Sequence, residues 1–144
     1  MKRKFLSLFA ILVAFTAVTM LSGCSNNGAE RLEAALQFNV EVQNIGQGNT
    51  TFRFEVLDLE DNVLVWNVST NETTVGDALL YLGLVSGDVS AFGLFVTEVN
   101  GIVADFGVDN TWWAFFIDGE MAMTGADATS IEQGRTYAFV LTEN

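Results

Sequence analysis

Residues 111–119 read TWWAFFIDG, and this stretch decides which folds the chain can adopt. In a β-strand the side chains alternate between two faces, and here both alternating sets are apolar. Such a strand lies in a sheet that is covered on both faces, or it leaves one aromatic face exposed. The first set is Trp113, Phe115 and Ile117, and the second is Trp112, Ala114 and Phe116.

The sequence leaves open what covers the second set. A domain with one helix usually covers only one face of its sheet. The second set is then either buried beneath loops or a curled sheet, or exposed. An exposed aromatic surface of this size generally marks a binding surface for a ligand or a partner. Both interpretations are retained here.

Two dipeptides predict hairpins around this strand. Asn100-Gly101 and Asp118-Gly119 are typical of the tight turns that join antiparallel strands. The first predicts that a strand over 94–99 returns through 102–103, and the second ends the aromatic strand. A last strand is predicted over 137–141.

One main helix is predicted after Thr74. This threonine occupies the N-cap position, and Asp77 lies three residues later, where a capping box places its acidic member. Apolar residues recur at helical spacing up to Leu82, and Gly83 ends the helix.

Upstream, apolar residues alternate with polar ones over 36–43 and again over 52–56, which is typical of half-buried strands. The intervening Gly46-Gln47-Gly48-Asn49 supplies a turn, so the pattern predicts a hairpin. Residues 63–68 predict a further strand. The fold class predicted for residues 36–144 is α+β, a β-grasp-like mixed sheet with hairpins and one main helix, preceded by a signal peptide.

The first 24 residues have the organisation of a bacterial export signal. Residues 1–4 are a basic head, and residues 5–20 are an apolar run shorter than the roughly 20 residues that a bilayer span prefers. Residues 21–24 read LSGC, which resembles the lipobox of bacterial lipoproteins. Cys24 is the only cysteine, so an intramolecular disulfide is impossible, and lipidation would remove an exposed free thiol.

We therefore expect residues 1–23 to be a cleaved lipoprotein signal peptide and Cys24 to carry diacylglycerol and acyl chains such as palmitate. Residues 24–35 are expected to form a lipidated tether, followed by a single α+β domain over 36–144. The protein would be exported and anchored by lipid to the outer face of the bacterial cell membrane.

Charge and missing residue types exclude several functions. The formal net charge is −12, and without residues 1–23 only Arg31, Arg53 and Arg135 oppose 18 acidic residues. Such a surface repels nucleic acid. The chain has no histidine, and its lysines all lie in the signal, so nucleophilic catalysis and zinc sites lack their usual groups. We expect no catalytic residue, no metal site and no enzymatic activity, and a carboxylate-based hydrolase ranks well below a binding function.

One oxygen-rich turn is an alternative to this expectation. Asp58, Glu60, Asp61 and Asn62 could hold calcium, although their spacing is not that of an EF-hand loop. A solvated turn is the favoured interpretation.

An ordered series of short motifs resembles a known family. The series contains TVGDAL at 74–79, FGLFVT at 92–97 and the two hairpin dipeptides around the tryptophan strand, followed by Gly125 and Gly134. It is similar to the C-terminal domain of transcobalamin and intrinsic factor, which bacterial proteins carry as the domain of unknown function DUF4430. The resemblance covers about residues 70–144.

The resemblance implies that the ligand is cobalamin or a related corrinoid, and that no cofactor is covalently bound apart from the lipid. In those carriers two stretches touch the corrin ring, and they match residues 92–97 and 113–122. Aromatic side chains would pack on the ring, and backbone groups near the second turn would bind its amides. The implied ligand-binding residues are Phe92, Gly93, Leu94, Phe95, Val96, Thr97, Trp113, Phe115, Phe116, Asp118, Gly119, Met121 and Ala122.

The leading hypothesis is a surface lipoprotein that binds cobalamin, or another small molecule, and delivers it to an uptake system such as a vitamin transporter. We expect the ligand to be held from one side, because the sequence matches only one of the carriers' two domains. Without a histidine to ligate cobalt, the ligand would keep its own lower base. The alternative is a non-enzymatic protein–protein interaction module of the cell envelope.

Overall fold

The computed structural model describes residues 27–144 of the chain. The predicted signal peptide, the predicted lipidation site Cys24 and residues 25–26 lie outside the described residues. Over residues 27–144, no helix combines the length and the apolar character needed to cross a membrane.

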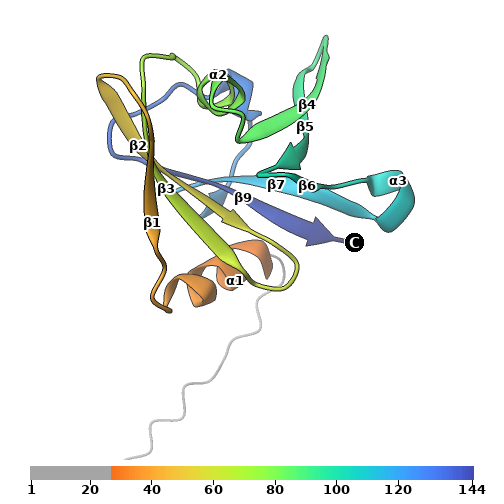
Figure 1. Cartoon of the computed structure of the whole chain (residues 1–144). Coiled ribbons are helices and arrows are strands. Elements are labelled where there is room, and N and C mark those ends of the chain that lie inside the picture. Colours follow the sequence, from red (N-terminus) through yellow and green to blue (C-terminus); the bar gives the residue numbers. More distant parts are fainter. Residues whose placement is uncertain (1–26) are drawn as a thin grey trace, which may run out of the picture.

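The described chain forms a six-stranded mixed sheet and a separate three-stranded antiparallel sheet (Figure 1). The strand order of the large sheet is β1-β3-β2-β9-β7-β8, with parallel pairing of β1 to β3 and of β2 to β9. The large sheet contains β1 (Val42–Gly46), β2 (Thr50–Leu57), β3 (Val63–Thr70), β7 (Thr111–Ile117), β8 (Glu120–Met121) and β9 (Thr136–Glu143). The small sheet contains β4 (Val85–Ser90), β5 (Gly93–Val99) and β6 (Ile102–Val103).

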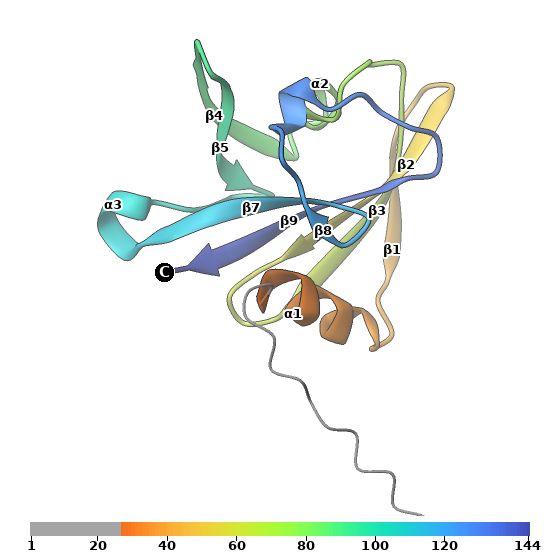
Figure 2. The same ribbon diagram turned by 180° about the vertical axis from the view of Figure 1, so that it is seen from behind.

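Helices cover both faces of the large sheet. In Figures 1 and 2, α1 lies against one face, and α2 and the small sheet lie on the other. The predicted α+β class with a mixed sheet is confirmed, with a second helix, α1, added to the one main helix expected. The helices are α1 (Asn27–Leu36), α2 (Val75–Tyr81), the single turn α3 (Phe106–Asp109) and the 3₁₀ turn η1 (Ala126–Ala128).

Helix α1 covers the second apolar set of the aromatic strand. Leu32 and Ala35 are buried on α1 and belong to one cluster with Ala114 and Phe116 of β7. Trp112 is partly buried at the border of the same cluster. The question left open by the sequence is therefore answered by a helix formed from the segment expected to be a tether.

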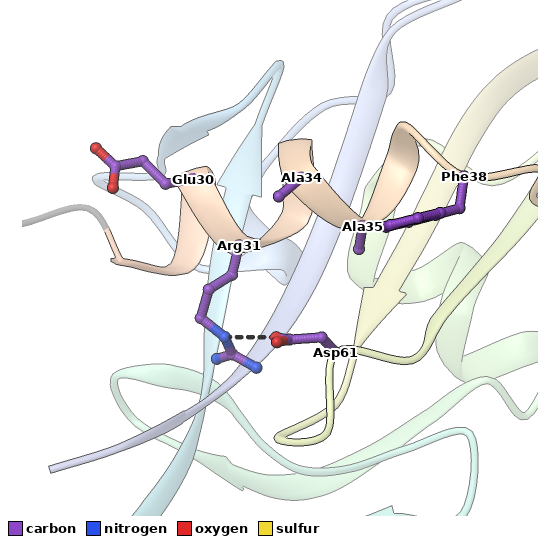
Figure 3. A pocket seen from close by; sticks show the side chains of 6 residues that line it. All are labelled: Glu30, Arg31, Ala34, Ala35, Phe38 and Asp61. Carbon is purple, nitrogen blue, oxygen red and sulfur yellow. Dashed lines mark hydrogen bonds and ion pairs between the residues drawn. The ribbon is translucent and has the colours of Figure 1, made fainter. Parts of the chain in front are cut away.

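Arg31 connects α1 to the β2–β3 turn and to β9 through three hydrogen bonds. Its guanidinium donates from Nε to Asp61 Oδ1 at 2.8 Å, from Nη1 to the Leu141 carbonyl at 3.1 Å and from Nη2 to the Asp58 carbonyl at 2.5 Å. Figure 3 shows the Arg31–Asp61 pair beside a pocket of about 330 Å³. Glu30, Arg31, Ala34, Ala35, Phe38 and Asp61 line this pocket.

The opposite face of the sheet carries the larger core. Phe54 of β2 stacks on Trp66 with ring centroids 5.7 Å apart, and Phe115 lies 5.1 Å from Phe139. Helix α2 buries Val75, Ala78 and Leu79 in this core. Because sheets bury their apolar faces against other elements, this second layer supplies the cover for Trp113 and Phe115.

The local signals for α2 and for the two hairpins are confirmed. Thr74 Oγ1 accepts a hydrogen bond from the Asp77 backbone N–H at 3.2 Å, as the predicted N-cap requires. Asn100 and Gly101 have φ of 48° and 79°, and Asp118 and Gly119 have φ of 49° and 82°. Positive φ at both central residues is the mark of the tight hairpin turn that these dipeptides predict.

The N-terminal strand prediction is wrong in two respects. Residues 36–43 do not form one strand, because α1 continues to Leu36 and β1 begins at Val42. The apolar residues Leu32, Ala35 and Leu36 recur at helical spacing, and burial of this stripe against the sheet favours the helix. In addition, β1 forms no hairpin with β2, since it pairs in parallel with β3.

Candidate functional site

The β4–β5 hairpin forms an arm that projects from the body of the domain (Figures 1 and 2). Ser90 Oγ accepts a hydrogen bond from the Phe92 backbone N–H at 3.1 Å and so closes the tip. Phe92 is fully exposed, Val89 is 80% exposed, and Phe95 is 60% exposed. Exposed apolar side chains of this size on a projecting hairpin are typical of a binding surface. Val89 pairs with Leu94, so it lies on the face of the hairpin opposite Phe95.

Strand β5 attaches the arm to the domain. Val96 and Val99 of β5 are buried in the larger core, and Leu94 packs against it. Gly93 has φ of 106°, and a Cβ there would lie 2.6 Å from Asp127 Oδ2 of η1. Glycine at this position therefore lets β5 approach η1 closely.

The β7–β8 hairpin forms the second part of the candidate site. Asp118 Oδ1 accepts from the Thr136 N–H at 3.0 Å, and its Oδ2 accepts from Arg135 Nε at 2.7 Å. The hydrogen bond from Arg135 lowers the pKa of Asp118 below its usual value, and the same bond raises the pKa of Arg135. The Asp118 N–H in turn donates to the Thr136 carbonyl at 2.8 Å, and these contacts together fix the turn.

A shallow pocket of about 440 Å³ lies beside this hairpin. Met121 and Met123 border it and are exposed, Met123 almost completely. Exposed methionine is adaptable apolar surface, suited to a ligand of irregular shape. The lining residues are Ile117, Asp118, Glu120, Met121, Ala122, Met123 and Arg135.

The two parts lie next to each other in the fold. The Ala122 N–H donates to the Phe115 carbonyl at 2.9 Å, and the chain then runs into η1. Strand β5 contacts both η1 and β7. The predicted stretches 92–97 and 113–122 are thus neighbours in the fold, because β5 contacts β7, although they are separate in the sequence.

The predicted site residues differ in their exposure to solvent. Phe92, Phe95, Asp118, Gly119 and Met121 are exposed. Gly93, Leu94, Thr97, Phe115 and Ala122 are partly buried, and Val96, Trp113 and Phe116 are buried.

Two of the predicted aromatic contacts are core residues. Trp113 is 6% exposed and donates from Nε1 to the Ile102 carbonyl at 3.3 Å. Phe116 is 1% exposed and lies beneath α1, on the face of β7 opposite Phe115. Because Phe115 and Phe116 lie on opposite faces of a covered sheet, they cannot pack on one ligand together. The aromatic side chains of the predicted set that are open to a ligand are Phe92 and Phe95.

Two exposed apolar residues near these parts were not predicted from the sequence: Val89 on the arm and Met123 beside the β7–β8 hairpin. Strand β4 contains Gly87 and Asp88, which are unfavourable in strands and conceal the strand signal around Val89. Met123 follows strand β8, which at two residues is too short to show the alternation of apolar and polar side chains that marks a strand.

The turn over residues 58–62, considered above for calcium, is closed by hydrogen bonds to the Asp58 side chain. Asp58 Oδ1 accepts from the backbone N–H of Glu60 and of Asn62 at 2.8 and 2.9 Å. Its Oδ2 accepts from Asn62 Nδ2 at 2.8 Å. These bonds make Asp58 the closing residue of the β2–β3 turn.

Comparison with known proteins identifies the class of domain. Residues 72–142 match the family model described as Domain of unknown function (DUF4430). The match covers 71 of the 144 residues, in the C-terminal part of the chain. None of the curated proteins compared with the chain matches it.

Two solved structures share the fold. A protein from Ruminococcus gnavus ATCC 29149, for which metal binding has been suggested, has 27% sequence identity and a TM-score of 0.63. The match covers 67% of this chain and 99% of that one. Haptocorrin in complex with Cbi has 16% identity and a TM-score of 0.55, and the match covers 69% of this chain and 26% of haptocorrin. The chain thus resembles about a quarter of haptocorrin, and this likeness shows the fold.

Proposed function

We propose that this protein is a membrane-anchored lipoprotein that captures cobalamin or a related corrinoid and delivers it to an uptake system. The observation that carries the proposal is the exposure of Phe92 and Phe95 on the projecting β4–β5 arm. The ligand lies between this arm and the β7–β8 hairpin, across η1. The protein acts as a carrier and not as an enzyme.

The chemistry of a corrinoid matches this surface. A corrin is a large apolar disc rimmed with neutral amides, so it needs apolar contact on its face and polar groups at its rim. Phe92 and Phe95 supply the first, together with Met121 and Met123. The backbone of the Asp118-Gly119 turn, fixed by Arg135 and Thr136, supplies the second. The fold shared with haptocorrin, solved with Cbi, supports this assignment.

The expected affinity is modest. The match covers 26% of haptocorrin. The family resemblance implies that this chain holds a corrinoid from one side. A ligand held from one side buries less of its surface, and fewer contacts offset the entropy lost on binding. Attachment through Cys24 and release to a transporter are part of the proposal, since a modest affinity favours transfer.

Isothermal titration tests the proposal. A soluble form with Cys24→Ser and without residues 1–23 is titrated with cobalamin and with cobinamide. We expect saturable binding that Phe92→Ala weakens about tenfold, which corresponds to about 1.4 kcal/mol. Phe38→Ala is the matched control, because Phe38 is also largely exposed but lies at the end of α1, away from the arm.

Two results would contradict the proposal. One is the absence of binding with either corrinoid at ligand concentrations near 1 mM. The other is an equal loss of affinity in Phe92→Ala and Phe38→Ala, because that would separate binding from the arm. Failure to bind any corrinoid would favour the alternative of a protein–protein interaction module, for which the same apolar arm is the docking surface.

A further inference from the structure

Strand β1 is a free edge of the large sheet. It lies at one end of the strand order and pairs only with β3 (Figure 1). In both views no element of residues 27–144 lies beyond it. All of its residues except Ile45 are exposed. An edge of this kind presents a row of backbone N–H and C=O groups that can pair with another strand.

The two edges of the sheet are built differently. The opposite edge, β8, is two residues long, contains Glu120 and follows the Asp118 turn. Short length and charge are devices by which proteins protect an edge from pairing. Strand β1 has neither charge nor proline, and its register with β3 runs without a bulge from Val42↔Val65 to Gly46↔Ser69.

Charge indicates which partner fits this edge. Residues 42–52 and 63–71 contain no charged side chain, in a protein whose 18 acidic residues are spread over the rest of the domain. Two copies that approach by most other surfaces bring carboxylates together, which like-charge repulsion disfavours. The β1–β3 edge is the surface where a second copy meets the least repulsion.

We propose that β1 pairs antiparallel with β1 of a second copy about a two-fold axis near Asn44, which joins the two large sheets into one. A two-fold interface uses the same patch on both copies, and the strand is self-complementary in this sense. Asn44 faces its counterpart, and Gln43 faces Ile45 of the other copy. Asn67 Nδ2 donates to Asn44 Oδ1 at 3.2 Å and so orients the side chain at the axis.

The dimer is expected to be weak in solution. A five-residue strand buries far less than the roughly 1,200 Å² of a stable interface. Its association therefore depends on protein concentration. The inference is independent of the proposed ligand, because β1 lies at the opposite end of the strand order from the β7–β8 hairpin.

Sedimentation velocity of the soluble Cys24→Ser form, from about 5 to 500 µM, tests the pairing. We expect a rise in sedimentation coefficient with concentration that Asn44→Glu abolishes, because two carboxylates then face each other across the axis. Asn144→Glu is the matched control with the same charge change at the C-terminus. Circular dichroism checks that both variants keep the fold.

Oxidative cross-linking tests the register. In the Cys24→Ser background, Asn44→Cys places two thiols across the axis, where directly opposite Cβ atoms are about 4.5–5.5 Å apart. We expect a disulfide-linked dimer from Asn44→Cys and much less from Asn39→Cys in the exposed loop before β1. A protein that stays monomeric at every concentration overturns the proposal, as does a dimer that Asn44→Glu leaves intact. Equal cross-linking at both positions overturns it too.

Discussion

Gly28 of α1 lies directly on the ring of Phe116 in β7. A Cβ at Gly28 would be 2.9 Å from Phe116 Cζ and 3.4 Å from Val140 Cγ1. The absence of a side chain at Gly28 lets the first turn of α1 reach the sheet. This contact makes the segment after Cys24 an integral part of the domain.

Enlarging Gly28 is therefore expected to separate α1 from the sheet. Gly28→Leu places side-chain atoms where the Phe116 ring lies, and overpacking of this kind costs about 1–3 kcal/mol of unfolding free energy. Urea denaturation followed by circular dichroism measures the change. Ala34→Leu is the control, because Ala34 is exposed on the same helix. Equal stability of the two variants would show that α1 is not pressed against Phe116.

Arg31 is expected to hold the same helix by hydrogen bonds. Arg31→Ala leaves the Asp61 carboxylate and two carbonyls without this donor, and bonds to charged groups contribute about 1.5–3 kcal/mol. Arg31→Lys should restore only part of the stability, because an ammonium group cannot span three separate acceptors in this arrangement. Thermal unfolding of both variants measures the difference. A full rescue by lysine would contradict the three-acceptor geometry.

The ion pair of Asp118 predicts a loss of stability in acid. Its pKa is lower in the folded protein than in the unfolded chain, chiefly through the hydrogen bond from Arg135. The unfolded state therefore binds more protons, and stability contributed by this group is present above about pH 4 and is lost as pH falls through the folded pKa. Asp118→Asn should flatten the pH dependence of the melting temperature below pH 4. An unchanged acid slope in this variant would contradict the assignment.

Local chemistry explains which parts of the fold the sequence predicts. The Thr74–Asp77 cap and the two positive-φ dipeptides act within a few residues, so each is visible in the chain. Helix α1 has no such signal, and its short apolar stripe runs into an alternating pattern after Leu36. The parallel pairing of β1 with β3 depends on contacts between distant segments, which periodicity does not encode.

For the candidate site too, the sequence predicts the local pattern but not the contacts with distant segments. The alternation over 111–117 predicts that both faces of β7 are apolar, but the cover over each face comes from elsewhere in the chain. Burial of Phe116 depends on α1, and burial of Trp113 depends on the layer that contains α2 and the small sheet. The exposure of Phe92 depends on how far the β4–β5 arm projects, a property of the packed structure.

The short distance between Cys24 and α1 predicts how the domain is oriented at a membrane. Asn27, the first residue of α1, is three residues after Cys24, and an extended chain spans at most about 3.6 Å per residue. If Cys24 carries the lipid, the start of α1 lies within about 11 Å of the anchoring point. The β4–β5 arm, on the other face of the sheet, then points away from the membrane and is open to a ligand (Figure 1).

Site-specific fluorescence quenching in vesicles measures this orientation. If Cys24 carries the lipid, its sulfur is blocked by diacylglycerol, so the lipidated protein with Glu30→Cys or Val89→Cys has one free thiol for a fluorophore. Both positions are exposed, one on the first turns of α1 and one on the arm. A spin-labelled lipid should quench the probe at position 30 much more strongly than the probe at position 89. Equal quenching, or the reverse order, would show that the arm also lies on the bilayer, where it would serve membrane contact instead of capture from solution.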